Sequence, residues 1–487
     1  MTVKAKTRKP RAGLLLVASP RFKNLYGPKR GTYGQRKEKA VEEIKASMDF
    51  LELVDPGIVY EREDAEKAIK LFFDKDVDFV YAEFLSWSED FAWIRFLRDC
   101  PAMPIIFCNV AKPRMTFETT LDEDDFVDYL CAGTLVGSLE ASGSLKRVPR
   151  KNVRTVMGTR KEITEKVRIY ADAARTRSIL RESSVGLMAN MNEAMWSTYF
   201  DNYDLFTKIG PEIHYLPYSD YGTEIENLSQ EEVQAYADEL TSQYKMMEDV
   251  DYDKFIGCVK ATLGIKKLAQ KNNIDCYVYN DIDQATFRTA GCRAGFYPQW
   301  FNENVSVLVP EADIGAGLAT YILKLLTGKN VNFIEPFHIE DDFGTFAGGH
   351  AGPNDHNDPR WQDNVVISRD VRFAKTSWKY AGAPFAWYRI SPGLKTVCGL
   401  YEEDGRYKMV VFMAESLSEK DTPQSDRKHL LATYTHTIFR PQVPVKELFE
   451  RVLKVGVTQH YAIVDGDWRP QLEALAGIMN FEYYDIR

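Results

Sequence analysis

The stretch AGLLLVA, residues Ala12–Ala18, decides the fold class, because an uninterrupted run of apolar and small residues predicts a buried β-strand. Such runs are typical of parallel sheets that are covered on both faces. The run is far shorter than the roughly 18 apolar residues needed to cross a bilayer. It faintly imitates the apolar part of a signal peptide, but Ser-Pro-Arg follows it and no A-x-A cleavage site is present. We therefore favour a first buried strand.

Strand-like and helix-like segments alternate outward from this run through residue 155. The expected strands are Gly13–Ala18, Gly57–Tyr60, Asp78–Ala82 and Pro104–Cys108, with helices at Gln35–Leu51, Asp64–Asp74 and Trp87–Arg98 between them. This alternation predicts a parallel sheet with helices on both faces. No G-x-G-x-x-G motif follows the first strand, so we expect no dinucleotide site there.

A second segment of the same kind follows a long helix expected at Glu162–Glu182. Its strands are expected at Val185–Ala189, Glu212–Tyr218, Ile274–Tyr279 and Val305–Pro310. After residue 330 the runs become short, aromatic and β-branched, and Asp404-Gly405 between two of them predicts a hairpin. We expect an α/β protein with two doubly wound (Rossmann-like) domains, 1–160 and 161–328, followed by a mainly antiparallel β domain, 329–487.

Composition excludes some classes of partner. The formal net charge is -9, which gives no electrostatic basis for binding nucleic acid. The basic stretch Lys4–Arg11 is interpreted as a solvated tail. The seven cysteines are dispersed without a C-x-x-C pair, a pattern typical of reduced thiols in the cytoplasm. We expect a cytoplasmic protein with no nucleic-acid and no membrane partner.

His350 lies in the glycine-rich stretch Phe346–Asp355 (FAGGHAGPND). Three glycines within five residues let the backbone approach closely whatever the imidazole touches. Such a turn is costly in chain entropy, which indicates a function for His350. The alternative is a loop histidine whose hydrogen bonds are satisfied locally.

Three further residues are candidates for chemistry, and Asp313 lies close to one of them in the sequence. Glu311 directly follows the expected strand VSVLVP, and ligands gather at the carboxyl ends of such strands; the alternative is a helix N-terminal carboxylate. Asp313 either lies behind a ligand or faces solvent. Glu335 ends the strand VNFI, or else belongs to an acidic surface turn. His460 stands in the apolar stretch GVTQHYAIV, where a core histidine is the alternative.

Two carboxylates and two imidazoles on four separate turns, with no thiolate, suit Mn²⁺, Co²⁺ or Fe²⁺ better than structural zinc. An open coordination position would accept vicinal sugar oxygens. The sequence alone leaves open whether the four side chains converge.

Six stretches resemble, in the same order, segments of the L-arabinose isomerase/L-fucose isomerase family. They are GLLLVASPRFKNLYGP, VLVPEADIGAGLATYIL, VNFIEPFHIEDDFGTFAGGHAG, TVCGLYEEDGRYKMVVF, GVTQHYAIV and LEALAGIMNFEYYDI. The resemblance implies a metal-dependent aldose–ketose isomerase of three domains. It also implies a homotrimer or homohexamer in which a neighbouring subunit completes each active site.

Carried over position by position, the resemblance implies that Glu311, Glu335, His350 and His460 hold the metal, with Mn²⁺ as the expected ion. It also implies that Glu311 and Glu335 are the catalytic carboxylates, moving a proton through an enediol, with a hydride shift as the alternative route. The interval between Glu335 and His350 is shorter than the family's, which makes Glu340 a rival ligand.

The chain departs from the family where the sugar is bound. Arg21 or Lys23 stands where a glutamine is usual, while Tyr26 is kept, and the tract Cys131–Thr134 lacks the usual Gln and His. Arg21, Lys23 and Tyr26 are therefore expected to contact the sugar. Basic residues there suggest an anionic or modified sugar such as sulfoquinovose; the alternative is that they are surface charges.

Two other classes of function fit the same residues. A sugar epimerase, aldolase or dehydratase would use the same carboxylate–histidine site. A non-catalytic sugar-binding protein would share the tandem α/β domains but would not need a metal. We also expect His356, His429 and His436, which lie outside the candidate site, to tolerate substitution.

Overall fold

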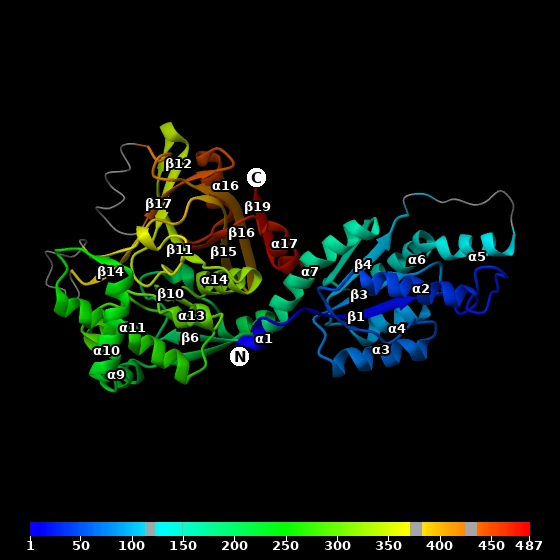
Figure 1. Ribbon diagram of the computed structural model, residues 1–487, viewed down its shortest axis with the longest axis horizontal. Helices are drawn as coiled ribbons and strands as arrows, with labels where there is room; N and C mark the ends of the chain where they lie inside the picture. The colour runs from blue at the N-terminus through cyan, green and yellow to red at the C-terminus, as the bar shows by residue number, and fades with distance from the viewer. Residues whose placement is uncertain (113, 115–121, 149, 371–381, 424–435) are drawn as a thin grey trace. The chain divides into compact units, whose positions relative to one another are not determined.

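The computed structural model of the chain describes residues 1–112, 114, 122–148, 150–370, 382–423 and 436–487 (Figure 1). It divides into two compact units. The first unit comprises Met1–Thr7, Ile179–Arg469 and Phe481–Arg487, and the second comprises Arg8–Ser178 and Pro470–Asn480. His429 lies outside the described residues.

In the described residues, the second unit contains a five-stranded parallel sheet in the order β2-β1-β3-β4-β5. Its strands are β1 (Arg11–Val17), β2 (Glu52–Val54), β3 (Phe79–Phe84), β4 (Ile105–Val110) and β5 (Val153–Gly158). The apolar run beginning at Ala12 forms β1 and is buried, as predicted. The prediction of a strand at Gly57–Tyr60 was wrong. Gly57 has a φ of +88°, and this segment meets β1 only through a single bridge from Val59 to Val17.

Helices cover both faces of this sheet. They are α2 (Tyr33–Ala46), α3 (Arg62–Asp74), α4 (Phe91–Asp99), α5 (Glu123–Ala132), α6 (Thr134–Arg147) and α7 (Arg160–Arg181), joined by residues of α17 (Arg469–Met479). Helices α3, α4 and α6 share one apolar core with Val80 of β3. Phe79, the preceding residue, points to the opposite face and packs edge-on against Tyr170 of α7.

The first unit has its own parallel sheet, which in the described part of the chain has the order β10-β9-β6-β7. The strands are β6 (Ser184–Met188), β7 (Glu212–Leu216), β9 (Cys276–Tyr279) and β10 (Val307–Pro310). The helices of this region are α9 (Tyr218–Glu226), α10 (Gln230–Gln243), α11 (Tyr252–Lys271), α12 (Gln284–Ala290), α13 (Gln299–Glu303) and α14 (Ile314–Thr327). From its other edge the order is β7-β6-β9-β10, which repeats that of β2-β1-β3-β4.

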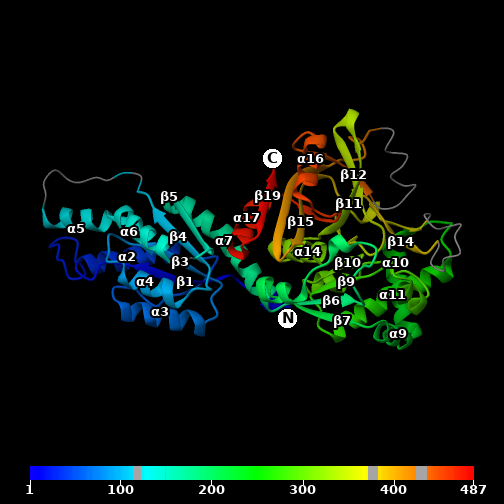
Figure 2. The same cartoon turned by 180° about the vertical axis from the view of Figure 1, so that it is seen from behind.

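The remainder of the first unit is mainly antiparallel, as predicted. Within the described ranges its largest sheet has the order β15-β18-β11-β12-β17-β16-β19, and a further pairing of β15 with β16 closes it on itself. Figure 2 labels β11, β12, β15 and β19 of this sheet. The strands are β11 (Asn332–Glu340), β12 (Thr345–Gly349), β15 (Gly393–Glu403), β16 (Arg406–Ser416), β17 (His436–Pro441), β18 (Tyr461–Asp465) and β19 (Glu482–Ile486). A small sheet joins β8 (Lys245–Met246), β13 (Val366–Arg369) and β14 (Pro384–Trp387), and α16 (Val445–Val455) precedes β18.

The predicted hairpin at Asp404-Gly405 is confirmed. These two residues connect β15 and β16, and both have positive φ values, +50° and +73°. This is the geometry that Asp-Gly favours in a tight turn between antiparallel strands.

Helix α14 connects the two kinds of sheet in the first unit. Every residue from Ile314 to Leu326 is buried, and the helix contacts β9 and β10 on one side and β15 and β18 on the other. Its N-terminus therefore lies where the carboxyl end of β10 meets the start of β18. Among the described residues no helix is long and apolar enough to cross a membrane.

Candidate metal centre

Three of the four predicted ligands converge in the first unit. Glu311, His350 and His460 each offer one ligand atom, and these atoms all lie within 4.8 Å of one another. Glu311 faces one imidazole with each carboxylate oxygen: Oε1 lies 3.1 Å from His350 Nε2, and Oε2 lies 3.3 Å from His460 Nε2. No other group of this kind occurs in the part of the chain that the structure describes.

Glu311 lies on a strained turn between β10 and α14. Both Glu311 and Ala312 have left-handed backbone conformations, with φ values of +64° and +54°. The turn is fixed from both sides: the Glu311 amide donates to Asp281 Oδ1 at 2.9 Å, and Asn192 Nδ2 donates to the Glu311 carbonyl at 3.0 Å. Strain of this kind costs about 1–3 kcal/mol per residue and is concentrated at functional sites.

His460 immediately precedes β18 and is fully buried. Its Nδ1 lies 2.8 Å from Asp313 Oδ2, and the other oxygen of Asp313 accepts the Ala316 amide at 2.9 Å to cap α14. In the neutral ring the proton therefore lies on Nδ1, which leaves Nε2 without a hydrogen-bond partner. Nε2 faces Glu311 Oε2 at 3.3 Å, so the ring nitrogen that is free of the Asp313 contact points toward the carboxylate of the group.

His350 follows β12 and is held in the same manner. Its Nδ1 donates to the Ala351 carbonyl at 2.6 Å, which directs Nε2 toward Glu311. The Phe333 ring of β11 lies against both imidazoles, with centroid distances of 4.7 Å to each. Both histidines thus have a fixed ring orientation and an acceptor behind them, as metal-binding histidines do.

A buried ion pair connects the two ligand-bearing turns. Arg293 pairs with Asp281, the residue that accepts the Glu311 amide, and also donates to the Ala351 carbonyl at 3.2 Å. Gly352 has a φ of +101°, and a Cβ there would lie 3.1 Å from the Arg293 guanidinium. Sequence reasoning missed this pair; Asp281 could have been suspected from its position after β9, whereas nothing in the sequence marks Arg293.

Charge at this site favours a cation. Burial alone would raise the pKa of Glu311, but the imidazoles of His350 and His460 hold it well below its usual range. Burial would likewise lower the pKa of His460, but the carboxylates of Asp313 and Glu311 raise it above its usual value. The two carboxylates thus stabilise positive charge on the His460 imidazole.

The donor set fits a divalent metal ion. One carboxylate and two imidazole nitrogens, without thiolate, suit Mn²⁺, Co²⁺ or Fe²⁺ and leave coordination positions open for a substrate. Nε2 of His350 and Nε2 of His460 each face one oxygen of Glu311, so a single ion between them could contact all three side chains. The structure also identifies the acceptors behind both ligands, which the sequence could not name.

The predicted ligand Glu335 lies beside this group without being part of it. It pairs across β11 and β12 with Gly349, the residue before His350, and is half-buried. No hydrogen bond or ion pair joins its carboxylate to any residue described by the structure. The rival Glu340 lies at the far end of the same hairpin, opposite Thr345, and pairs with His338 at 3.3 Å.

The three predicted sugar-contacting residues lie in the second unit. Arg21 pairs with Glu89 at 2.8 Å, and Lys23 lies over the Tyr60 ring with its Nζ 4.6 Å from the centroid. Tyr26 is 62% exposed. Arg21 and Lys23 thus each have a partner within the second unit.

Comparison with known proteins identifies no family for this chain. A scan against models of known protein families returned no match, and a search of curated proteins returned none either. Function therefore has to be inferred from the three convergent ligands and the residues behind them.

Proposed function

We propose that the protein is a cytoplasmic, divalent-metal-dependent aldose–ketose isomerase of the L-arabinose/L-fucose isomerase type. The observation that supports this most strongly is the convergence of Glu311, His350 and His460 at the carboxyl end of a parallel strand, the usual place for a ligand in α/β folds. The turns that bear these residues are among the stretches that resemble this family.

In this proposal Glu311, His350 and His460 hold the ion, with Mn²⁺ preferred and Co²⁺ or Fe²⁺ as substitutes. When bound, the ion supplies a Lewis acid that polarises the carbonyl and hydroxyl oxygens of an open-chain sugar. Asp313 and the Ala351 carbonyl keep the two rings oriented through their Nδ1 atoms. The resemblance adds Glu335 as a fourth ligand.

Glu335 is also the proton carrier in this proposal. Conversion of an aldose to a ketose by the enediol route takes a proton from one carbon and returns it to its neighbour. A carboxylate used for this purpose must be close to the metal ligands and not neutralised by another residue. Glu335 meets both conditions, because it is half-buried, lies opposite the residue before His350 and lacks a polar partner among the described residues.

We further propose that the two parallel sheets are doubly wound, Rossmann-like units and that the protein is a homotrimer or homohexamer. The shared strand order supports the first point. Exposed aromatic side chains of the first unit support the second, since Trp196 and Tyr203 are each 76% exposed and such residues are enriched in interfaces. Light scattering after size exclusion tests the oligomeric state, and a mass equal to that of a single chain would contradict this proposal.

The decisive experiment compares metal binding with turnover. Protein stripped with EDTA and reloaded with Mn²⁺ is offered neutral pentoses, hexoses and anionic sugars, and ketose formation is measured. Glu335→Gln should lose most activity with an unchanged fold, whereas Glu340→Gln on the same strand should retain it. An active Glu335→Gln variant would refute the assignment of the proton carrier.

Product analysis and isotope incorporation complete the test. An isomerase conserves mass and forms a ketose, whereas an aldolase or dehydratase changes the mass and an epimerase forms another aldose or ketose. Solvent deuterium in the product supports proton transfer by Glu335, and its complete absence would favour a hydride shift. Metal-independent sugar binding without turnover would contradict the proposed class.

A further inference from the structure

The second unit contains a cavity of about 830 Å³ at the carboxyl ends of its parallel strands. It lies next to the ends of β3 and β4 and the start of α7, and is bordered by α2 and α5. Seven cationic side chains line it, against three carboxylates; the cations are Arg30, Arg36, Lys37, Lys39, Lys112, Arg160 and Lys161. Cavities of this size and place commonly hold small-molecule ligands.

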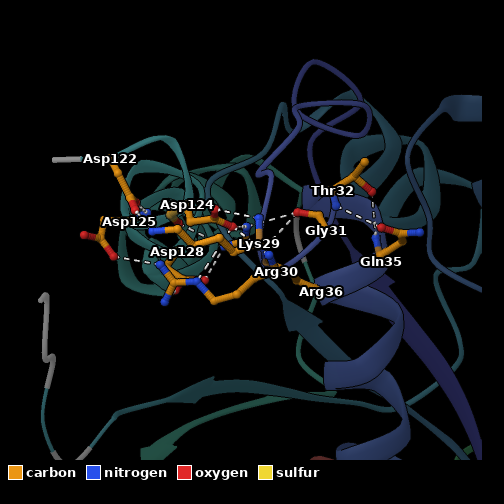
Figure 3. Close-up of polar contacts among 10 residues, drawn as sticks. All are labelled: Lys29, Arg30, Gly31, Thr32, Gln35, Arg36, Asp122, Asp124, Asp125 and Asp128. Atoms are coloured by element: carbon orange, nitrogen blue, oxygen red, sulfur yellow. Dashed lines mark hydrogen bonds and ion pairs between the residues drawn. The ribbon is translucent and has the colours of Figure 1, made fainter.

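The three arginines are neutralised by the protein itself. Arg160 pairs with buried Glu83 at 3.0 Å. Figure 3 shows that Arg30 and Arg36 instead point into a cluster of aspartates at the start of α5. The contacts there are Arg30 with Asp125 and Asp128 and Arg36 with Asp124 and Asp128.

This cluster also fixes the segment that begins α2. The backbone amides of Lys29 and Arg30 both donate to Asp124 at 2.9 Å, and Thr32 and Gln35 cap the helix by reciprocal hydrogen bonds (Figure 3). Helix α2, which bears Arg36, Lys37 and Lys39, is therefore held against α5. The cationic wall of the cavity is preformed rather than assembled by chance from surface chains.

The four lysines, by contrast, have no counter-ion in the part of the chain that the structure describes. Within the described ranges no carboxylate lies within ion-pair distance of Lys37, Lys39, Lys112 or Lys161. Lys37 is only 4% exposed, and its ammonium donates to the carbonyls of Leu85 and Cys131 instead. Burial lowers the pKa of Lys37 to about 8.

A buried ammonium without a counter-ion is expensive unless an anion accompanies it. The start of α7 adds to the positive potential, because Thr159, Arg160 and Lys161 line the cavity at the N-terminus of a 22-residue helix. Glu162, one residue further on, is occupied by its hydrogen bonds to Thr159 and does not line the cavity. Glu43 is the one lining carboxylate without an ion pair among the described residues, so a positive excess remains.

We propose that this cavity binds a small molecule through a phosphate, sulfate or sulfonate group held by Lys37, Lys112 and Lys161. The cavity is larger than one such group, so it also has room for an organic part. The inference uses residues of the second unit alone, and it holds whether or not the first unit isomerises sugars.

Calorimetry on the full chain tests the proposal. Inorganic phosphate, inorganic sulfate, glucose 6-phosphate and glucose are titrated at constant ionic strength. We expect saturable binding of at least one of the three oxyanion-bearing probes and none of glucose. The variant Lys112→Gln/Lys161→Gln should weaken binding by at least about tenfold, because two charge-assisted contacts are lost.

The control is Lys70→Gln/Lys75→Gln, which removes the same charge from exposed positions at α3 in the same unit and should leave binding unchanged. Lys37→Met should abolish binding, and urea unfolding shows whether this variant folds. If it does not fold, the Lys112→Gln/Lys161→Gln variant, which changes only exposed side chains, decides the test. Binding of glucose 6-phosphate alone would identify an organic phosphate as the ligand, and equal binding of inorganic phosphate a free anion. Absence of saturable binding, or equal weakening in the control, would overturn the proposal.

Discussion

The two parallel sheets of this protein share a strand order but differ in the chemistry at their carboxyl ends. In the first unit, Glu311 and Asp313 follow β10 and face two imidazoles. In the second unit, lysines that have no ion-pair partner among the described residues line the cavity at the ends of β3 and β4. The fold thus determines where a ligand gathers, whereas the residues just beyond the strands determine the charge of the ligand.

The two sites also differ in what lies behind them. Arg293 and Asp281 form a buried pair behind the metal ligands. Behind the lysines lie arginines that are already neutralised by aspartates, so the positive charge of the lysines is left to an outside partner. Substitutions in each unit can test whether the two sites act independently and whether they bind ligands of opposite charge.

The largest effect is expected from Glu311→Gln. The variant keeps the volume of the side chain but removes the charge between His350 and His460. Mn²⁺ affinity, measured by calorimetry, should fall by more than the roughly 10–100-fold typical for loss of a partner behind a ligand. Glu303→Gln, an exposed position in the same unit, should change nothing, and phosphate binding should be intact in both variants. An unaltered Mn²⁺ affinity would contradict the assignment of Glu311 as a metal ligand.

Arg293→Met should destabilise the first unit. It leaves Asp281 buried without a counter-ion, which typically costs about 3–5 kcal/mol. Urea unfolding should show this loss, together with weaker Mn²⁺ binding because the Glu311 turn loosens. Arg288→Met on the exposed face of α12 serves as control. Adding Asp281→Asn should restore part of the stability, and a double variant as unstable as the single one would argue against the pair.

Mild acid should distinguish the two units. Burial lowers the pKa of His356 to about 3, below its ordinary value of 6.5, so the unfolded chain binds the extra proton between these values. Stability is therefore lost as the pH falls below 6.5, by about 2 kcal/mol between pH 7 and pH 5. Urea titrations of His356→Gln over the same pH range should show a loss of stability that is smaller by about this amount. Hydrogen exchange in residues 8–178 should be the same in the wild type and in His356→Gln, because His356 belongs to the first unit. This stretch also contains no histidine of its own.

We therefore expect His356 to tolerate substitution less well than its sequence context suggested. Its Nε2 accepts the Tyr297 amide at 3.2 Å, and its ring packs edge-on against Tyr244. A pH slope identical in the wild type and in His356→Gln would contradict this account.

The smallest effect is expected from Thr32→Ala in the second unit. Loss of the cap at the start of α2 should cost about 1 kcal/mol and weaken oxyanion binding, because α2 bears Lys37. Thr32→Ser should behave as the wild type. Mn²⁺ binding by the first unit should not change, and a change would show that the two sites are coupled.

Several features could be predicted from the sequence because they are local. The apolar run of β1, the Asp404-Gly405 turn, the position of Glu311 after a strand and the glycines around His350 all follow from short-range patterns. Strand β5 was missed because it is a polar, half-exposed strand at the sheet edge, whose sequence lacks an apolar run.

The rest of the metal centre depends on contacts that are distant in sequence. Nothing near Asp313 indicates that it accepts a hydrogen bond from His460, and nothing near Arg293 indicates its contact with the residue after His350. The four lysines of the cavity come from three separate segments and look like ordinary surface charges. Only the fold shows that their carboxylate partners are absent among the described residues.

The division of the chain into units has a consequence for its biosynthesis. Residues 8–178 form one continuous stretch, whereas the first unit is assembled from residues 1–7, 179–469 and 481–487. During translation the bulk of the second unit can thus fold on the ribosome while the first is still incomplete. Glu311 and His350 emerge well before His460, so the group of three side chains is complete only once His460 has been synthesised, and β19 joins its sheet after that. A metal ion held by all three side chains could therefore bind only after His460 has emerged.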